Sequence, residues 1–466
     1  MVIKNIINRY DHIIGLYRFW LRERLYSKKP GNLKKERFPF KGNLDDLPQI
    51  DLKFLNTGPH NEYSYNGSRF DIIDFRERVI TRYSIAAPYL SKILALAKKI
   101  IPNSKMPHEI GHDDFFNRDR RTPHTCHLTP DGFLCATISY CIYIINTNNG
   151  KTFFLPADYN KKLWLYSHTG CFSPDYKYFY FVRWKYKGAI AVLKHEIERT
   201  HCEIGRVKLD DFSIEILHEL EYFDEVHQIA CTADNKHLIF VTFPFYIPIS
   251  FESNLTINEI GNYIDKGLKL STVVTYDLEK KVHWETKVPI PTPAHFQLDL
   301  SDLNIFYVSA HNIFFNIKHG IVVAGLGAIF KMKISDGETT IIGKYTGNEA
   351  VRLTQHVIYR RNDKTFIAAT TTSKRFVIID TESMEKINVT RIQPHPHPDF
   401  TKTKYFIFDS KNAFPLSLNV SNDSKYIILG GDSMFYVYDI ENEHILDVNL
   451  FLPEGHSFGH STHLGA

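Results

Sequence analysis

Cysteine is scarce in this chain, and the usual marks of export or membrane insertion are missing. Among 466 residues there are 6 cysteines, and no two of them form a CxxC pair. The opening stretch MVIKNIINRYDHIIGLYRFW has charged residues where a signal peptide needs an apolar core, and no small-residue cleavage site follows it. No apolar run is long enough to span a bilayer. These absences predict a soluble protein in a reducing, cytoplasmic compartment.

Strong charge of one sign is also lacking, as are the motifs of several enzyme classes. The formal net charge is +4, and the basic residues do not gather into one face, so we expect no nucleic-acid partner. GLGAIFK, which starts at Gly325, has only half of a phosphate-binding loop and lies in a strand-rich region. GHSFG, at residues 455–459, matches the GxSxG spacing, but it lies in the glycine- and histidine-rich tail and not between a predicted strand and a helix. Nucleotide binding and serine-hydrolase chemistry are therefore not indicated.

Aromatic residues and a repeated motif are what the chain does have. The 26 tyrosines and 34 phenylalanines favour strands over helices. The motif is a histidine, a short apolar stretch, a polar turn and a second strand. In five copies the histidine stands seven positions before the turn aspartate: these are His124, His168, His227, His295 and His356, with Asp131, Asp175, Asp234, Asp302 and Asp363. A sixth copy begins loosely at His395, and a seventh has Asp423 but Leu416 in place of the histidine.

The repeat predicts an all-β protein, a seven-bladed β-propeller with an additional N-terminal helical lobe. Short strands recur with a period near 40 to 60 residues, and hairpins such as CIYIINTNNGKTFFL follow the turns, as in propeller blades. We expect three parts: a helical lobe and linker over 1–110, the propeller over 111–454, and a flexible histidine-rich tail over 455–466.

The helical lobe is predicted from apolar residues at three- and four-residue steps. They recur over residues 1–27, and a second helix is expected over about 71–101, interrupted by Pro88. The apolar stripe of 1–27 is interpreted as packing on the main domain. Its arginines and Trp20 also suit peripheral contact with a membrane surface. Both alternatives stay open.

The histidines in register predict a ring around the channel of the propeller. The first strand of a blade lies against the channel, so residues at one offset before the turn converge there. Neutral imidazoles facing one another favour a divalent cation, and they suit manganese, iron, zinc or copper alike. His395 and His397 are two apart, so both side chains point to one side of a segment kept extended by prolines. The rival interpretation is that blade duplication copied a structural histidine.

The stretch HPHPDFTKTKYFIFDS resembles the HPHP-containing blade of the oligogalacturonate lyases, and GCFSPDYKYFYF is similar to the repeat of the wider TolB-like propellers. The resemblance covers about residues 121–450. It implies β-elimination on an acidic oligosaccharide with manganese as cofactor, iron or zinc being alternatives. It further implies His395, His397 and Gln393 as metal ligands, joined by His356 or His295. His124 completes the ring of candidate ligands.

The remaining candidates are assigned by their chemistry. A ring histidine that holds no metal, His227 or His168, is the candidate general base, and Arg183 is a candidate for binding a substrate carboxylate. The chain departs from the lyases at Thr401-Lys402-Thr403, where they have a Pro-Asp-Gly type turn. Two other functions fit the same ring. One is a propeller oxygenase that holds iron through histidines, and the other is a non-enzymatic propeller that serves as a binding scaffold.

Overall fold

The computed structural model describes the chain in nineteen stretches, and every one of them consists of strands, turns and short connections. They are 33–57, 68–85, 126–138, 141–156, 163–167, 169–186, 202–220, 225–243, 271–288, 293–316, 320–335, 339–346, 356–370, 375–383, 386–391, 417–430, 434–448, 450–451 and 461–464. No helix occurs among these residues.

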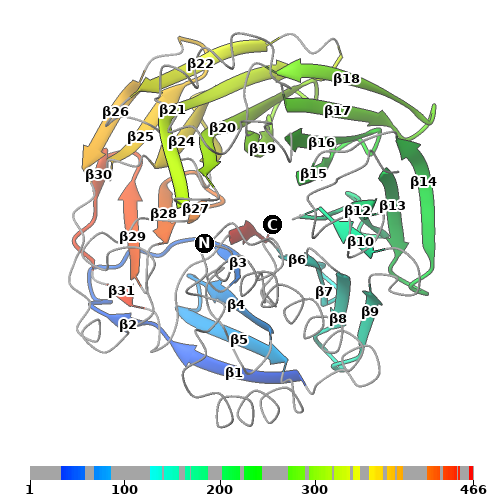
Figure 1. The fold of residues 1–466 in the computed structure, drawn as a ribbon. Coiled ribbons are helices and arrows are strands. Elements are labelled where there is room, and N and C mark those ends of the chain that lie inside the picture. The colour runs from blue at the N-terminus through cyan, green and yellow to red at the C-terminus, as the bar shows by residue number, and fades with distance from the viewer. Residues whose placement is uncertain are drawn as a thin grey trace, which may run out of the picture.

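The strands form seven sheets arranged around a centre, which is a seven-bladed β-propeller (Figure 1). Blades 1 and 7 combine strands from both ends of the chain. Blade 1 has the order β1 (Leu33–Pro39), β5 (Val79–Ile85), β4 (Ser68–Asp74), β3 (Lys53–Thr57) and β32 (Ser461–His463). Blade 7 has the order β2 (Lys41–Gly42), β31 (Leu450–Phe451), β29 (Met434–Asp439), β28 (Tyr426–Gly430) and β27 (Ser417–Val420), with β30 (His444–Ile445) also paired to β29.

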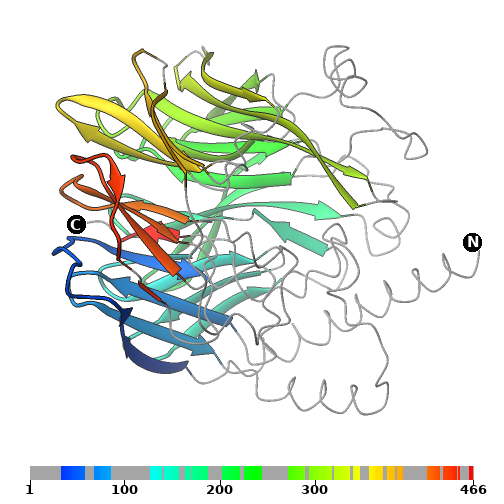
Figure 2. The same cartoon turned by 90° about the vertical axis from the view of Figure 1, so that its left-hand side faces the viewer.

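Blades 2 to 6 follow one another along the chain, each built from the centre outwards. Blade 2 contains β6 (Cys126–Leu128), β7 (Phe133–Ile138), β8 (Cys141–Asn146) and β9 (Thr152–Pro156). Blade 3 begins with β10 (Leu163–Tyr166) and β11 (Cys171–Phe172), which both pair with β12 (Tyr178–Tyr186). It continues with β13 (Cys202–Lys208) and β14 (Ile214–Leu220). Blade 4 contains β15 (Glu225–Cys231), β16 (His237–Phe243), β17 (Ser271–Asp277) and β18 (Val282–Val288). Blade 5 contains β19 (Pro293–Leu298), β20 (Ile305–Asn316), β21 (Gly320–Lys333) and β22 (Thr339–Thr346). Blade 6 contains β23 (His356–Arg361), β24 (Lys364–Thr370), β25 (Arg375–Asp380) and β26 (Lys386–Arg391). Side on, β20 and β21 extend past the neighbouring strands at one face of the disc (Figure 2).

The turn aspartates of the repeated motif close the hairpin between the first two strands of a blade. In blade 3, Ser173 Oγ donates to Asp175 Oδ1 over 2.6 Å, and the same carboxylate accepts the amide of Lys177. Tyr176, between them, takes a left-handed conformation with φ 55°. Thr232 with Asp234 and Ser421 with Asp423 repeat the hydroxyl–carboxylate bond. At Asp175, Asp234 and Asp423 the aspartate of the motif is therefore a turn former, as the sequence predicted.

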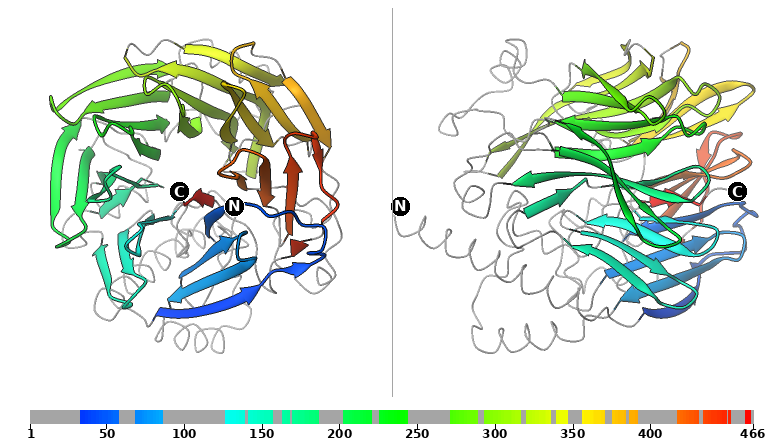
Figure 3. Two further views of the ribbon diagram at one scale, coloured as in Figure 1. Left: turned by 180° about the vertical axis from the view of Figure 1, so that it is seen from behind. Right: turned by 90° about the vertical axis from the view of Figure 1, so that its right-hand side faces the viewer.

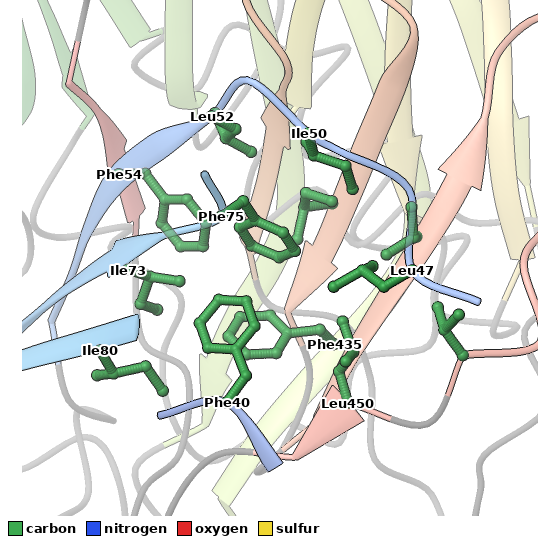
Figure 4. Packing of buried hydrophobic residues seen from close by; sticks show 13 residues of the cluster. Phe40, Leu47, Ile50, Leu52, Phe54, Ile73, Phe75, Ile80, Phe435 and Leu450 are labelled. Carbon is green, nitrogen blue, oxygen red and sulfur yellow. The ribbon is translucent and has the colours of Figure 1, made fainter. Parts of the chain in front are cut away.

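The ring closes where blade 7 meets blade 1. Figure 4 shows Phe54, Ile73 and Phe75 of blade 1 packed against Phe435 and Leu450 of blade 7. The rings of Phe75 and Phe435 meet edge to face with centroids 5.5 Å apart. Because these side chains are almost completely buried, the contact stabilises the junction by the usual hydrophobic gain of about 2 kcal/mol for each large residue.

The expected boundaries of the parts need correction. Residues 33–57 and 68–85 supply strands to blades 1 and 7, not to a helical lobe, and residues 71–85 form the end of β4, a turn and β5 where a helix was expected. Residues 1–32 and 86–110 of that expected lobe lie outside the described residues. The tail over 455–466 was expected to be flexible, yet its residues Ser461–His463 form β32, beside β3 (Figure 3).

The number of blades is confirmed, but one of them comes from a different part of the chain. We predicted seven blades, counting a short one around His395. Residues 392–416 lie outside the described residues, so none of the seven described sheets contains them. The seventh sheet is blade 1, which the sequence did not predict.

The cysteines whose side chains the structure describes are free thiols. Cys126, Cys135, Cys171 and Cys202 are buried inside strands, as expected, and burial raises the pKa of each thiol. A helix long and apolar enough to cross a membrane was not found in the described stretches.

Candidate functional site at the inner strands

The innermost strands of successive blades lie side by side around the centre: β32, β6, β11, β15, β19, β23 and β27. Of the predicted site residues, His295 and His356 are described in full and stand on β19 and β23. His227 stands on β15, and only its backbone is described. It has no partner residue in the pairing of β15 with β16, because a β-bulge lies between Val226 and Gln228. His124, His168, Gln393, His395 and His397 lie outside the described residues.

His356 begins β23 and is completely enclosed. Its exposed fraction is 1%, and neither ring nitrogen makes a hydrogen bond of good geometry with a described residue, although the backbone of Tyr307 interacts weakly with the ring. Burial lowers the pKa of His356 to about 4, and this interaction with Tyr307 opposes the shift only in part. The ring is therefore neutral at pH 7 and keeps a lone pair. Ile358, on the same face of β23, packs on Tyr307 of blade 5, so this face of the strand looks into the junction between blades 5 and 6.

His295 lies at the same register on β19 and is held by a glutamine of the preceding blade. Its Nδ1 is 3.3 Å from Gln228 Oε1, and its exposed fraction is 7%. The carboxamide of Gln228 also accepts the amide of Phe296 over 2.9 Å and donates to the carbonyl of Phe296 over 2.8 Å. Gln228 thus pairs with the inner edge of β19 as a neighbouring strand would.

The same arrangement joins the next pair of blades. Gln297 on β19 donates to the carbonyl of His356 over 2.6 Å and accepts the amide of Ile358 over 3.1 Å. Two junctions earlier, between blades 3 and 4, Thr169 Oγ1 accepts the amide of Ile229 over 3.1 Å. At each of three successive junctions, from blade 3 to blade 6, a side chain of one blade therefore hydrogen-bonds to the inner strand of the next blade.

These bridging residues were not predicted, although a signal was present. Thr169 directly follows His168, Gln228 directly follows His227, and Gln297 stands two positions after His295. A polar side chain at the start of an inner strand can satisfy the edge that faces the axis. The constant spacing of the motif is thus explained in part by the polar residues close to the histidines, which bridge neighbouring blades.

Replacing Gln297 by leucine tests this arrangement. We expect the free energy of unfolding to fall by about 2–4 kcal/mol, because the variant leaves a buried amide and a buried carbonyl without their partner. Gln297→Glu is the matched control: it keeps the acceptor for Ile358 and loses the donor to His356, so it should fall in between. Urea unfolding measures both. A loss within about 0.5 kcal/mol for Gln297→Leu, as at a surface site, would contradict the bridging role.

Arg183, the candidate for substrate binding, already has a carboxylate partner. It stands directly opposite Glu203 in the ladder of β12 and β13, with Nη2 2.7 Å and Nε 2.8 Å from Oε2 of Glu203. The two side chains are 15% and 10% exposed. Arg183 could bind a substrate carboxylate only by sharing its guanidinium with Glu203, and its substrate role stays a prediction.

Another histidine on an inner strand, the half-buried His127, was not predicted. It stands on β6, and its ring packs on Phe172 and Phe179 of blade 3. Nε2 has no partner among the described residues, and burial lowers the pKa of His127 to about 4, partly offset by the backbone of Gly170. The inner strand of blade 3 is interrupted beside it. A side chain on Gly170 would collide with the ring of Phe179, so glycine is needed for this close contact.

The described residues do not by themselves assemble a metal centre. No group of three histidine, cysteine, aspartate or glutamate side chains comes together in the part of the chain that the structure describes. His356 meets the chemical requirement for a ligand, since its ring is neutral and makes no close hydrogen bond there. Of the other predicted ligands, His295 lies on β19 and contacts Gln228, and the rest lie outside the described residues: His124, Gln393, His395 and His397.

Comparison with known proteins supports the fold. No protein-family model and no curated protein matches the chain. Among solved structures, it is similar to cobalt-substituted apocarotenoid oxygenase of Synechocystis (11% identity, 95% of this chain and 99% of that chain, TM-score 0.52). It is also similar to a chimera of that oxygenase with RPE65 (12%, 96% and 98%, TM-score 0.52) and to an oligogalacturonate lyase in complex with manganese (10%, 90% and 98%, TM-score 0.47).

Fold and inner strands together place the chain among the seven-bladed β-propellers. The likeness to propellers that the sequence suggested is confirmed at this level. At identities of 10–12% it concerns the fold and says nothing of the reaction.

Proposed function

We propose that this propeller is a divalent-metal-dependent lyase that acts on acidic, uronate-type oligosaccharides. The observation that carries the proposal is His356: a completely buried, neutral imidazole at the start of an inner strand, whose ring has only a weak interaction with the backbone of Tyr307 among the described residues. A buried imidazole with such poor hydrogen bonding costs about 1–3 kcal/mol, which supports a ligand at this position.

Chain topology supports His395 and His397 as further ligands. The stretch that contains them follows β26, the last strand of blade 6, and leads into β27. β27 lies against β23, the strand that begins with His356. The HPHP stretch thus joins blade 6, whose inner strand begins with His356, to blade 7, whose inner strand is β27.

In this proposal, the chain's residues bind and orient the substrate and move one proton. A divalent ion, when bound, would withdraw charge from the uronate carboxylate and acidify the proton on the adjacent ring carbon. His227 or His168, left without metal, would accept that proton. Neutral histidine is the form that can do so, and it is also the form that binds a metal.

Metal content and turnover test the proposal together. We expect about one equivalent of divalent ion in the wild type and none in His395→Ala/His397→Ala, with loss of the ultraviolet absorbance that an unsaturated uronate product gives. His444→Ala, on exposed β30, serves as the matched control and should change neither. Equal metal content in the double variant and the wild type would contradict the proposal. Bound iron with oxygen uptake would favour an oxygenase instead, and a melting temperature unaffected by chelation would favour a binding scaffold.

A further inference from the structure

Two histidines meet on the outer part of the disc, away from the inner strands. His218 stands on β14, the outermost strand of blade 3, and His283 stands on β18, the outermost strand of blade 4. His218 Nε2 lies 3.0 Å from His283 Nδ1. We propose that this pair is a surface site for a divalent transition-metal ion, zinc above all, that links blade 3 to blade 4.

The two rings are held in place by their surroundings. The ring of His218 lies against the ring of Tyr276, with centroids 5.0 Å apart, and the hydroxyl of Tyr276 donates to the carbonyl of Leu217 over 3.2 Å. Tyr276 is also the direct cross-strand neighbour of His283. Trp284, next to His283, donates its indole N–H to the carbonyl of Ile334 in blade 5. Both imidazoles therefore stand on strands anchored on either side.

The distance between the nitrogens suits a shared ion. Zinc binds imidazole nitrogen at about 2.0–2.1 Å in a tetrahedral arrangement, which sets two ligand nitrogens about 3.3 Å apart. The observed 3.0 Å needs only a small opening. In the metal-free pair, one ring donates an N–H hydrogen bond to the facing nitrogen of the other ring. When a metal ion binds, the donor ring must hold its proton on the nitrogen that points away from the partner. Both facing nitrogens, His218 Nε2 and His283 Nδ1, then offer lone pairs to the ion.

A nearby carboxylate favours this tautomer. Glu285 Oε1 is 3.8 Å from His283 Nε2, on the side of the ring away from His218, which favours the proton on Nε2 and leaves Nδ1 to bind the ion. The carboxylate of Glu285 beside His283 also makes the site attractive to a cation.

Access and ligand number define what the site can bind. His283 is 30% exposed and His218 is half-buried, so an ion can reach the pair from solvent. The chain supplies two imidazoles, and water fills the remaining positions. Nitrogen ligands of this type select zinc, nickel or copper over magnesium or calcium.

Titration with Zn²⁺ in wild type and variants tests the site. We expect His218→Gln and His283→Gln each to lower the affinity for one Zn²⁺ at least tenfold and to abolish the rise in melting temperature that this ion causes. Glutamine keeps a hydrogen bond across the junction, which protects folding. His237→Gln is the matched control: it lies in the same blade, near Trp284 and Asp277, and should leave binding unchanged.

The same titration in His395→Ala/His397→Ala separates this site from the proposed catalytic ion, because the pair should still bind there. Glu285→Gln provides a milder second variant, with an expected affinity loss of about tenfold. If both glutamine variants at the pair bind Zn²⁺ as the wild type does, the contact is a hydrogen bond only and the proposal is wrong.

Discussion

A chain that ends after residue 460 will lose most of its stability, while one that ends after residue 464 will keep it. The shorter form lacks β32, whose three residues pair with Asn56, Leu55 and Phe54 on β3. It also lacks Leu464, which packs on the cluster between blades 1 and 2 and whose amide donates to the carbonyl of Lys53. With about 1 kcal/mol for each hydrogen bond and 1–2 kcal/mol for the leucine, the expected loss is about 5 kcal/mol.

A loss of this size is comparable with the whole stability of many domains. Thermal unfolding and soluble yield measure it, and the chain that ends after residue 464 is the control because it differs from the full chain only at residues 465–466. Equal melting temperatures for the two shortened forms would show that β32 does not hold the ring closed.

Acid will destabilise the protein through His127, and His127→Leu will remove that part of the pH dependence. The pKa of His127 is about 4 in the folded chain and about 6.5 when unfolded, so the unfolded state takes up the proton first as the pH falls. The unfolding free energy is therefore highest above about pH 6.5 and declines between pH 6.5 and 4. The shift corresponds to at most about 3 kcal/mol, since the His127 side chain is only half-buried.

Urea unfolding at several pH values between 4 and 7 checks this prediction. The comparison is of slopes, since His127→Leu also removes a polar contact to Gly170 and can shift the stability at every pH. His444→Leu is the matched control, because His444 is exposed on β30. If the slope of stability against pH is the same in His127→Leu and the wild type, another group accounts for the acid sensitivity.

The repeated part of the fold could be predicted because its turns follow one chemical rule. A hydroxyl residue, an aspartate two positions later and a left-handed residue after it mark the hairpins at Asp175, Asp234 and Asp423. Blade 1 has no such signal. Its hairpin turns through Asp74 and Arg78, and Arg78 takes φ 52° without being glycine or asparagine.

Contacts from distant residues hold that turn. The guanidinium of Arg78 donates to the carbonyls of Leu44 and Leu47, which lie far back in the chain. A local pattern cannot show such contacts, and the apolar spacing of the segment suits a helix equally well. The last strand was missed for a similar reason, since Ser461–His463 is too short to show alternation.

The position of the histidines in the fold was predicted in part. His227, His295 and His356 stand on inner strands, but the face of β23 that carries His356 looks into the junction of blades 5 and 6 and not into the channel where a ring was expected. The bridging of neighbouring blades by Gln228 and Gln297 was missed, because it depends on how the inner strands lie side by side. The metal assignment of the remaining histidines stays a prediction.

The pairing of β3 with β32 also bears on the order of folding. Blades 2 to 6 are each formed from one continuous stretch, so their contacts are local and can form early. Blade 1 must bring its inner strand from the far end of the chain, against the entropy of closing almost the entire polypeptide into a loop. We expect the seam between blades 1 and 7 to form last in refolding, and amide exchange there to start before that of the middle blades.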